Sequence, residues 1–513
     1  MVKDNGVQLK TGIVLSYVQM FLSVIIGIIQ SPIIIRCLGQ SEYGLYNTIV
    51  SMLSMLTVLS LGFNSSYVRY YSIYKKSGDN DAIYRLNGLF LIIFLIIGLI
   101  SLSCGLFLTY NLKLVFANGL TQVEYGIAKI LMIILTFNVT LTFPMSVFQN
   151  IIMAHEKFIF FKLLIMVKTV LSPLITIPVV LMGYGSIGLA VITVGMSTAV
   201  DIAFVLFTLI SLKQKFYFRN FEKGLFKSLF NFTFFIAINL IVDEVNTNLD
   251  KVLLSRYSGT VATAIYSVGF TLYNYYRLFS TSISGVFATR VHRIYNENKE
   301  DGVLLKKNLT DIFVKVGRIQ FLVLSLIAMG FTFFGKAFIQ HWVGEGYEES
   351  YYVGVLLIIP STIALMQNVG LEIQRAQNKH KFRSLFYLGM AVVNVVLTIW
   401  LCQIYGAVGA AMGTAISFVL ANGIAMNIYY HKACKINVLE FWKQILLMMR
   451  GFIIPVIVGI LALKFINLTS IWLFLVSIVA FVIIYSLSMW AFGMNAYERQ
   501  LIKKPLRRLF LKK

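Results

Sequence analysis

The chain is built from long apolar stretches separated by short, mostly basic loops. A helix needs about 20 apolar residues to cross the ~30 Å of hydrocarbon in a bilayer. The apolar stretches of this chain are long enough for such crossings, and they predict an all-α integral membrane protein with fourteen transmembrane helices. The expected spans are 11–35, 43–63, 86–108, 125–148, 163–182, 187–212, 229–254, 261–288, 312–334, 351–373, 384–404, 407–430, 445–463 and 471–493. We expect the first span to be a retained helix rather than a cleaved signal peptide.

Composition excludes most other classes of protein. Hydrophobic residues make up 58% of the chain and charged residues only 13%, against about 25% charged in a soluble domain. A soluble enzyme, a disordered chain and a nucleic-acid-binding domain are therefore excluded. The four cysteines are scattered, which favours neither a disulfide framework nor a metal site. The sequence has no GxSxG or Walker A motif, and we predict no catalytic residues, metal or cofactor.

The basic residues follow the predicted spans. With the N-terminus inside, 32 of the 44 Lys and Arg residues fall in inner segments and only five in outer loops. This bias is the positive-inside rule, which applies here loop by loop. It predicts that both termini are cytoplasmic, and it explains the net charge of +23 without a nucleic-acid partner. Because the outer loops are short, a receptor and a membrane polymerase are disfavoured.

The two halves of the sequence resemble each other. The segment IRCLGQSEYGLYN between spans 1 and 2 is similar to SRYSGTVATAIYS between spans 7 and 8, and YGSIGLA between spans 5 and 6 is similar to YGAVGAA between spans 11 and 12. Transporters often contain such repeats, and a six-helix unit relates the copies by an axis along the membrane normal. The matched pairs, at offsets of 220 and 221, are Arg36 and Arg256, Gly39 and Gly259, Tyr46 and Tyr266, Tyr184 and Tyr405, Gly185 and Gly406, Gly188 and Gly409, and Ala190 and Ala411.

The duplication predicts three parts. Residues 1–215 form an N-terminal lobe with spans 1 to 6, and 216–435 form a C-terminal lobe with spans 7 to 12. Residues 436–513 add spans 13 and 14 and a basic cytoplasmic tail. Two such lobes enclose a central cavity that opens to one side of the membrane and then to the other.

Charged side chains deep in the membrane are costly, which makes them candidate functional residues. In span 7, Asn239, Asp243, Asn246 and Asp250 recur at helical spacing, and Arg277 lies deep in span 8. We expect spans 1, 2, 7 and 8 to line a hydrated cavity. The candidate substrate-binding residues are Arg277, Lys251, Asn239, Asn246, Asn274, Gln19 and Gln30; the candidate ion-coupling residues are Asp201, Asp243, Glu244 and Asp250.

Two interpretations of Arg277 stay open. A guanidinium can bind a phosphate or pyrophosphate group, while the neighbouring amides and hydroxyls suit sugar hydroxyls. Alternatively, Arg277 pairs with Asp243 or Glu244 and holds two helices together. The shallower charges, such as Arg318 and Lys315, are snorkelling side chains or part of the cavity rim, or else they contact a ligand.

The hairpin motifs resemble a known family. Arg36, Leu38, Gly39, Tyr43, Gly44 and Tyr46 fit the first hairpin of the polysaccharide transporter family, as do DKVLLSRYSGTVATAIYSVG and YGAVGAAMGTAIS further along. This family includes the O-antigen and capsule flippases of the bacterial cytoplasmic membrane. It shares a superfamily with the lipid II flippase and with multidrug exporters.

The resemblance implies a flippase for oligosaccharides carried on undecaprenyl pyrophosphate, working by alternating access in surface polysaccharide biosynthesis. The expected partners are the lipid-linked oligosaccharide, membrane lipids, H⁺ or Na⁺, and a glycan polymerase and glycosyltransferases. The resemblance also implies that spans 13 and 14 border a groove for the lipid tail. The alternative is an ion-coupled multidrug or cation antiporter of the same fold.

Overall fold

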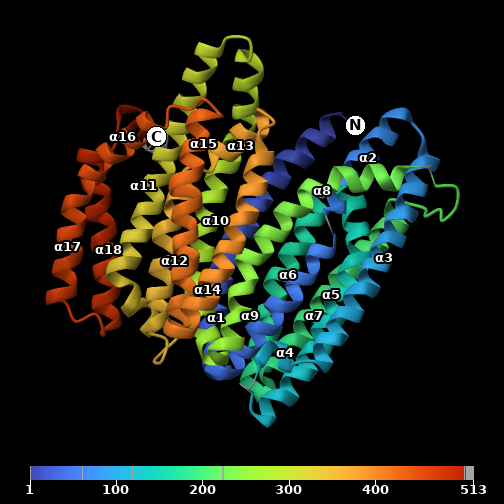
Figure 1. The fold of residues 1–513 in the computed structure, drawn as a ribbon, viewed down its shortest axis with the longest axis horizontal. Helices are drawn as coiled ribbons and strands as arrows, with labels where there is room; N and C mark the ends of the chain where they lie inside the picture. Colours follow the sequence, from blue (N-terminus) through green and yellow to red (C-terminus); the bar gives the residue numbers. More distant parts are fainter. Residues whose placement is uncertain (1, 61, 118–119, 222–223, 502, 504–513) are drawn as a thin grey trace, which may run out of the picture. The chain divides into compact units, whose positions relative to one another are not determined.

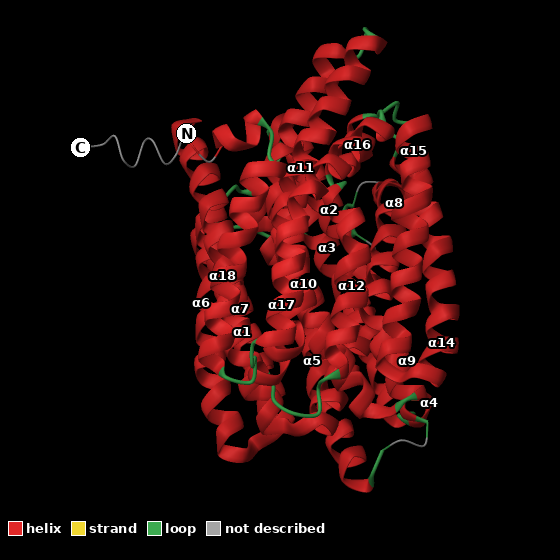
Figure 2. Ribbon diagram, turned by 90° about the vertical axis from the view of Figure 1, so that its left-hand side faces the viewer, coloured by secondary structure: helices red, strands yellow, loops and turns green. Residues whose placement is uncertain are grey.

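The computed structural model describes residues 2–60, 62–117, 120–221, 224–501 and 503. Helix is the only regular secondary structure in this described part of the chain (Figure 2). The prediction of an all-α membrane protein is confirmed. The chain divides into two compact units: residues 1–267 with 391–410, and residues 268–390 with 411–513. Helices α10 (Gly259–Asn298) and α14 (His380–Phe418) contribute to both units.

The first unit begins with the long helix α1 and ends its continuous part at the start of α10 (Figure 1). Non-α turns separate several of its helices. Its elements are α1 (Val2–Ser54), η1 (Met55–Ser60), α2 (Phe63–Ser77), α3 (Asn80–Tyr110), α4 (Lys113–Phe116), α5 (Gln122–Ala154), α6 (Phe158–Val179), η2 (Val180–Tyr184), α7 (Gly185–Leu206), η3 (Phe207–Ser211), α8 (Leu225–Glu244), η4 (Val245–Leu249) and α9 (Asp250–Tyr257).

The second unit contains the remaining helices. They are α11 (Gly302–Trp342), α12 (Glu349–Met366), α13 (Val369–Ala376), η5 (Val419–Ala425), α15 (Met426–Lys432), α16 (Val438–Met448), η6 (Met449–Phe452), α17 (Ile453–Phe465), α18 (Ile471–Ser488) and η7 (Met489–Gly493). The prolines at positions 32, 144, 173, 178, 360 and 455 all lie inside helices, as the span prediction requires.

Nine helical segments of the described residues are long and apolar enough to cross a membrane. Three of them, Val14–Ser77, Phe158–Ser211 and Phe382–Lys432, have 64, 54 and 51 residues. At about 1.5 Å per residue each is far longer than one crossing needs. Each of these three segments contains two predicted spans joined by a hairpin. Predicted spans 7 and 8 are not among the nine segments and fall on α8–α9 and α10. The number fourteen remains a prediction.

The hairpins are formed at glycines with positive φ. Gly39 and Gly259 have φ of 72° and 88°, and Gly185 and Gly406 both have φ of 54°. Such angles are costly for residues with a Cβ. The two glycine pairs are the ones matched by the sequence repeat, so equivalent positions adopt similar backbone conformations. This agreement supports the predicted duplication.

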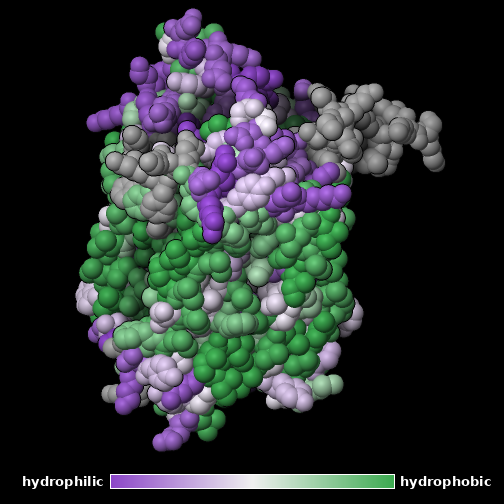
Figure 3. Space-filling model, turned by 90° about the vertical axis from the view of Figure 1, so that its right-hand side faces the viewer, coloured by the Kyte–Doolittle hydropathy of each residue, from purple (hydrophilic) through white to green (hydrophobic). Residues whose placement is uncertain are grey.

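Each unit has an aromatic core of its own. In the first, Tyr67 and Phe90 are fully buried and meet edge to face, with ring centroids 5.2 Å apart. In the second, Phe313 and Phe441 are fully buried with centroids 4.8 Å apart. On the face drawn in Figure 3, hydrophobic side chains occupy the middle and hydrophilic ones gather at the two ends. This distribution fits a protein surrounded by lipid.

Candidate functional site

Among the described residues of the first unit, the most enclosed acidic group is Asp250, at the start of α9. Its side chain is 2% exposed. Tyr266 on α10 donates a hydrogen bond of 2.8 Å to Oδ2, and Thr398 on α14 donates one of 3.2 Å to Oδ1. Two more amides extend the cluster: Asn394 lies 3.5 Å from Thr398 and donates to Asn246 at 3.5 Å. Four helical elements, η4, α9, α10 and α14, thus supply the oxygen and amide groups of this cluster.

The polar stripe predicted along span 7 is divided in the structure. A π-helical turn, η4, separates α8 from α9. The wider turn changes the phase of the helix, so residues before and after it no longer share a face. Asp243 is exposed while Asp250 is buried, and Asn239 and Asn246 are half-buried. The expectation of one continuous polar side is therefore wrong.

Glu244 lies next to this turn and is held locally. It accepts a hydrogen bond of 2.6 Å from Asn248, and it also interacts with the Thr57 hydroxyl of η1. The structure thus brings together polar residues of predicted spans 2 and 7. Lys251, which follows Asp250, is half-buried in the same unit.

A second polar cluster joins α5, α6 and α7. Gln149 donates a 3.0 Å hydrogen bond to Asp201, and Lys168 donates one of 2.8 Å to Ser197, one turn before Asp201. Lys168 and Asp201 also interact electrostatically. Asp201 therefore has partners of its own and is separate from the Asp250 cluster, so the candidate acids do not form one site.

The two glutamines of the first span differ in their surroundings. Gln19 accepts a long hydrogen bond of 3.5 Å from Lys162 on α6. Gln30 is half-buried on α1. The structure does not bring either amide into the Asp250 cluster.

Arg277 and Asn274 lie on α10 in the second unit. Arg277 is exposed, and Oδ1 of the half-buried Asn274 has no hydrogen-bond partner among the described residues. The opposite side of the helix is fixed by buried hydroxyl contacts: Tyr276 to Thr362 at 2.6 Å and Ser280 to Gln320 at 2.7 Å. Since Asp243 and Glu244 belong to the other unit, the pairing of Arg277 with either of them remains a prediction.

Arg318 does not snorkel to the lipid headgroups. It is 4% exposed and donates to the Glu498 carboxylate at 2.6 and 2.9 Å, to two oxygens of Gln444 and to the Gly493 carbonyl. This pair was not predicted, because Glu498 lies in the segment that we assigned to the basic cytoplasmic tail.

Asn394, Thr398 and Tyr266 were not predicted as partners of Asp250 either. A signal did exist for two of them: Asn394 and Thr398 are one helical turn apart in a span with no charged residue. Among the described residues, no group of three or more His, Cys, Asp or Glu side chains is placed to hold a metal ion.

An apolar groove runs between α11 and α18 in the second unit. It has a volume of about 340 Å³, and nearly all of its lining is apolar. A Cβ on Gly330 would meet nothing within 4 Å, so this glycine leaves room on the α11 side. The groove is lined by Leu326, Ile327, Gly330, Phe331, Phe334, Gly335, Phe338, Ile478, Phe481 and Val482.

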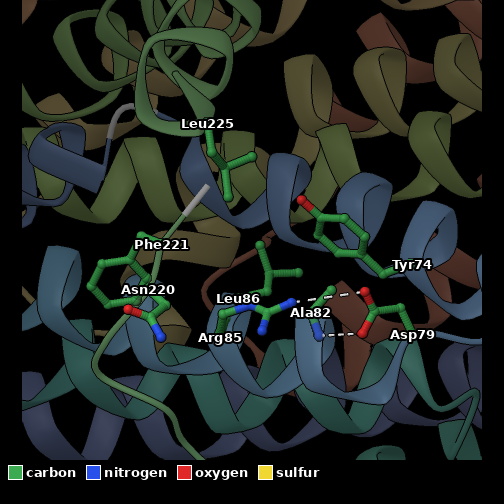
Figure 4. Close-up of a pocket in the computed structure, with 8 residues that line it drawn as sticks. All are labelled: Tyr74, Asp79, Ala82, Arg85, Leu86, Asn220, Phe221 and Leu225. Carbon is green, nitrogen blue, oxygen red and sulfur yellow. Dashed lines mark hydrogen bonds and ion pairs between the residues drawn. The ribbon is translucent and has the colours of Figure 1, made fainter. Parts of the chain in front are cut away.

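A smaller polar pocket of about 300 Å³ lies where α2 meets α3 (Figure 4). Asp79 caps α3 through the Ala82 amide at 2.8 Å and lies 3.8 Å from Arg85. The other wall is formed by Asn220 and Phe221, from the segment that follows η3. We call residues 212–221 of this segment the connector, because it leads from predicted span 6 to span 7.

The connector is attached to α3. The Tyr217 amide donates a 2.9 Å backbone hydrogen bond to the Tyr84 carbonyl on α3. The pocket is thus a junction between the connector and α3, and its ion pair belongs to the cap of a helix.

Fold and polar clusters together define a multi-pass membrane transporter. The chain belongs to the family described as "Polysaccharide biosynthesis protein", whose model matches residues 9–288. It is 22% identical over 419 residues to the "Putative O-antigen transporter" of Shigella flexneri, covering 78% of this chain and 92% of that protein.

Solved structures share the fold. The lipid II flippase MurJ in an inward closed conformation matches with a TM-score of 0.67 and 18% identity, over 96% of this chain and all of that one. An inward-facing multidrug resistance transporter of the MATE family matches with a TM-score of 0.57 and 13% identity, over 82% of this chain and 96% of that one. These relatives are transporters, in agreement with the prediction that the chain is not an enzyme.

Proposed function

We propose that the protein moves oligosaccharides linked to undecaprenyl pyrophosphate from the inner to the outer leaflet of a bacterial cytoplasmic membrane. Both termini then lie in the cytoplasm, and the hairpins at Gly39 and Gly259 lie outside. The observation that carries the proposal is the match to an O-antigen transporter over 92% of that protein, together with family membership. The MurJ-like fold, which extends over 96% of the chain, fits the same conclusion.

Two features of the second unit suit an amphipathic substrate. The α11–α18 groove is almost wholly apolar and can hold part of a polyprenyl chain through van der Waals contact. Arg277 is an exposed cation on a helix that also carries the unpartnered Asn274 oxygen. A guanidinium binds phosphate oxygens in bidentate fashion, so we assign Arg277 to the pyrophosphate. Lys251 and the amides of Asn239, Asn246, Asn274, Gln19 and Gln30 are the proposed further contacts.

We assign ion coupling first of all to the Asp250 cluster, ahead of the other candidate acids. A carboxylate surrounded by hydroxyl and amide oxygens suits a hard cation or a proton. Asp250 fits this role because Thr398, Tyr266 and Asn394 surround it. The other candidate residues for ion coupling, ranked after Asp250, are Asp201, Asp243 and Glu244.

The alternative is an ion-coupled multidrug or cation antiporter, which the MATE-like fold supports. Deletion of the gene distinguishes the two functions. A flippase mutant accumulates carrier-linked glycan that only cytoplasmic enzymes can reach, while its drug sensitivity stays unchanged. If the mutant becomes drug-sensitive and its glycan reaches the outer leaflet normally, the antiporter is correct.

A further inference from the structure

The hairpins between spans 1 and 2 and between spans 7 and 8 meet without any side chain between their backbones. A Cβ built on the buried Gly44 would lie 1.8 Å from the Thr260 carbonyl oxygen and 3.1 Å from the Ala264 nitrogen. Real Cβ atoms do not approach other atoms so closely, so only glycine fits at position 44. Thr260 and Ala264 are buried, which makes the contact dry.

A chain of hydroxyl groups borders this backbone contact. Ser41 donates to the carboxylate of Glu124 on α5, and its oxygen lies 2.8 Å from the Thr260 hydroxyl. A serine has one proton to donate. Because Ser41 gives it to Glu124, Thr260 must donate to Ser41, and the order is Thr260 to Ser41 to Glu124.

Glu124 is itself fixed in place. It forms a capping box with Thr121 at the start of α5 and accepts hydrogen bonds of 2.8 Å from the Thr121 amide and hydroxyl. On the other side of the hairpin, Glu42 accepts a 2.6 Å hydrogen bond from the Ser186 amide at the start of α7. The first hairpin is therefore held by α5 and α7, and the Gly44–Thr260 contact, together with the packing of α9 against α1 and α4, joins it to the hairpin between spans 7 and 8.

We propose that Ser41, Gly44 and Thr260 form the outer latch of the transporter, with Glu124 as the positioning residue. The inference rests on the proposed function and its orientation. Closing the outer side requires a glycine at 44, and the hydroxyl pair adds one hydrogen bond to the closed state. Opening it separates Ser41 from Thr260 and breaks the dry backbone contact at Gly44. A single neutral hydrogen bond contributes little net free energy, so the hydroxyl pair does not itself prevent the outer side from opening.

The test is a reversible cross-link. Ser41→Cys and Thr260→Cys are combined in a chain whose four native cysteines are replaced, with each single variant as a control. We expect oxidation to form the disulfide in membranes and to reduce flipping to the level of the vector control, and dithiothreitol to restore it. If the disulfide forms fully and flipping continues at the wild-type rate, the contact does not open and the proposal is wrong. If the disulfide does not form, the hairpins are not in contact and the proposal is also wrong.

A second variant tests the glycine. Gly44→Ala should prevent closure, abolish flipping and raise labelling of Ser41→Cys by a membrane-impermeant maleimide. Gly126→Ala is the matched control, because a Cβ there meets nothing within 4 Å. Maleimide labelling needs no substrate, so it tests the latch independently of transport. A wild-type chain that flips no glycan would contradict the proposed function and not the latch. Unchanged labelling of the Gly44→Ala chain would overturn the latch.

Discussion

Arg318 and Glu498 form a buried, bidentate ion pair between α11 and the segment that follows α18. All five guanidinium N–H groups have acceptors, because Gln444 and Gly493 take those that Glu498 does not. A buried charge without its partner is strongly destabilising, by roughly 3–5 kcal/mol. The pair therefore attaches the last two transmembrane helices to α11.

We predict that Glu498→Gln or Arg318→Met alone lowers the thermal stability of the detergent-purified protein sharply. The double change Arg318→Met with Glu498→Leu should recover much of the loss, since no charge is then left unpaired. The exposed pair of Arg293 and Glu297, 3.9 Å apart, offers a control: Arg293→Leu should change stability by less than ~1 kcal/mol. Equal losses in all variants would contradict the anchoring role.

Gly88 is predicted to hold the connector against α3. A Cβ there would lie 2.0 Å from the Tyr217 carbonyl oxygen. Gly88→Ala must push the connector away from α3, with an expected cost of about 1–3 kcal/mol in unfolding free energy. Thermal unfolding in detergent measures this cost against Gly195→Ala, whose Cβ meets nothing within 4 Å. A variant as stable as this control would mean that the connector moves at no cost.

Arg277→Ala should abolish flipping while the protein stays in the membrane at its normal level, because the proposed pyrophosphate contact is lost. Arg277→Lys keeps the charge but not the fork of donors, so it should retain partial activity. Flipping of labelled carrier-linked glycan and immunoblotting of membranes give the two readouts. Wild-type flipping by Arg277→Ala would remove this residue from the site.

Asp250→Asn should remove the dependence of transport on an ion gradient. The change keeps size and a hydrogen-bonding oxygen but removes the charge. Transport should become slow and insensitive to ionophores, and Thr398→Val should have a weaker effect in the same direction, because it removes only one donor to Asp250. Ionophore sensitivity at the wild-type level in Asp250→Asn would shift the coupling role to Asp201.

Native cysteines test the orientation. Cys37 is exposed near the Gly39 hairpin, while Cys402 and Cys434 are buried. Burial raises the pKa of the Cys434 thiol to about 11, so this thiol stays protonated and unreactive at neutral pH. Because Cys104 is only half-buried, an impermeant maleimide added outside should label a chain that keeps Cys37 alone and not one in which all four cysteines are replaced. Labelling of Cys37 only after the membrane is opened would place the hairpin inside.

Much of the fold could be predicted from the sequence because lipid imposes simple rules on apolar length and loop charge. The repeat also identified the glycines at 39, 185, 259 and 406 as hairpin positions. Side-chain partners were harder to predict. Glu498 lies 180 residues from Arg318, and no local pattern links them. The π turn η4 rotates Asp250 away from the face that carries Asp243. A prediction that assumes 3.6 residues per turn throughout the span does not anticipate this rotation.

The most direct test of the central claim is flipping by the purified protein in vesicles. Fluorescent undecaprenyl-pyrophosphate oligosaccharide is placed in both leaflets, and a membrane-impermeant reagent quenches the label that it can reach. With wild-type protein and an ion gradient, we predict that nearly all of the label becomes accessible. Arg277→Ala vesicles should stay at about half, as protein-free vesicles do. Wild-type vesicles that also stay at half, while the same protein exchanges a cationic drug, would contradict the account.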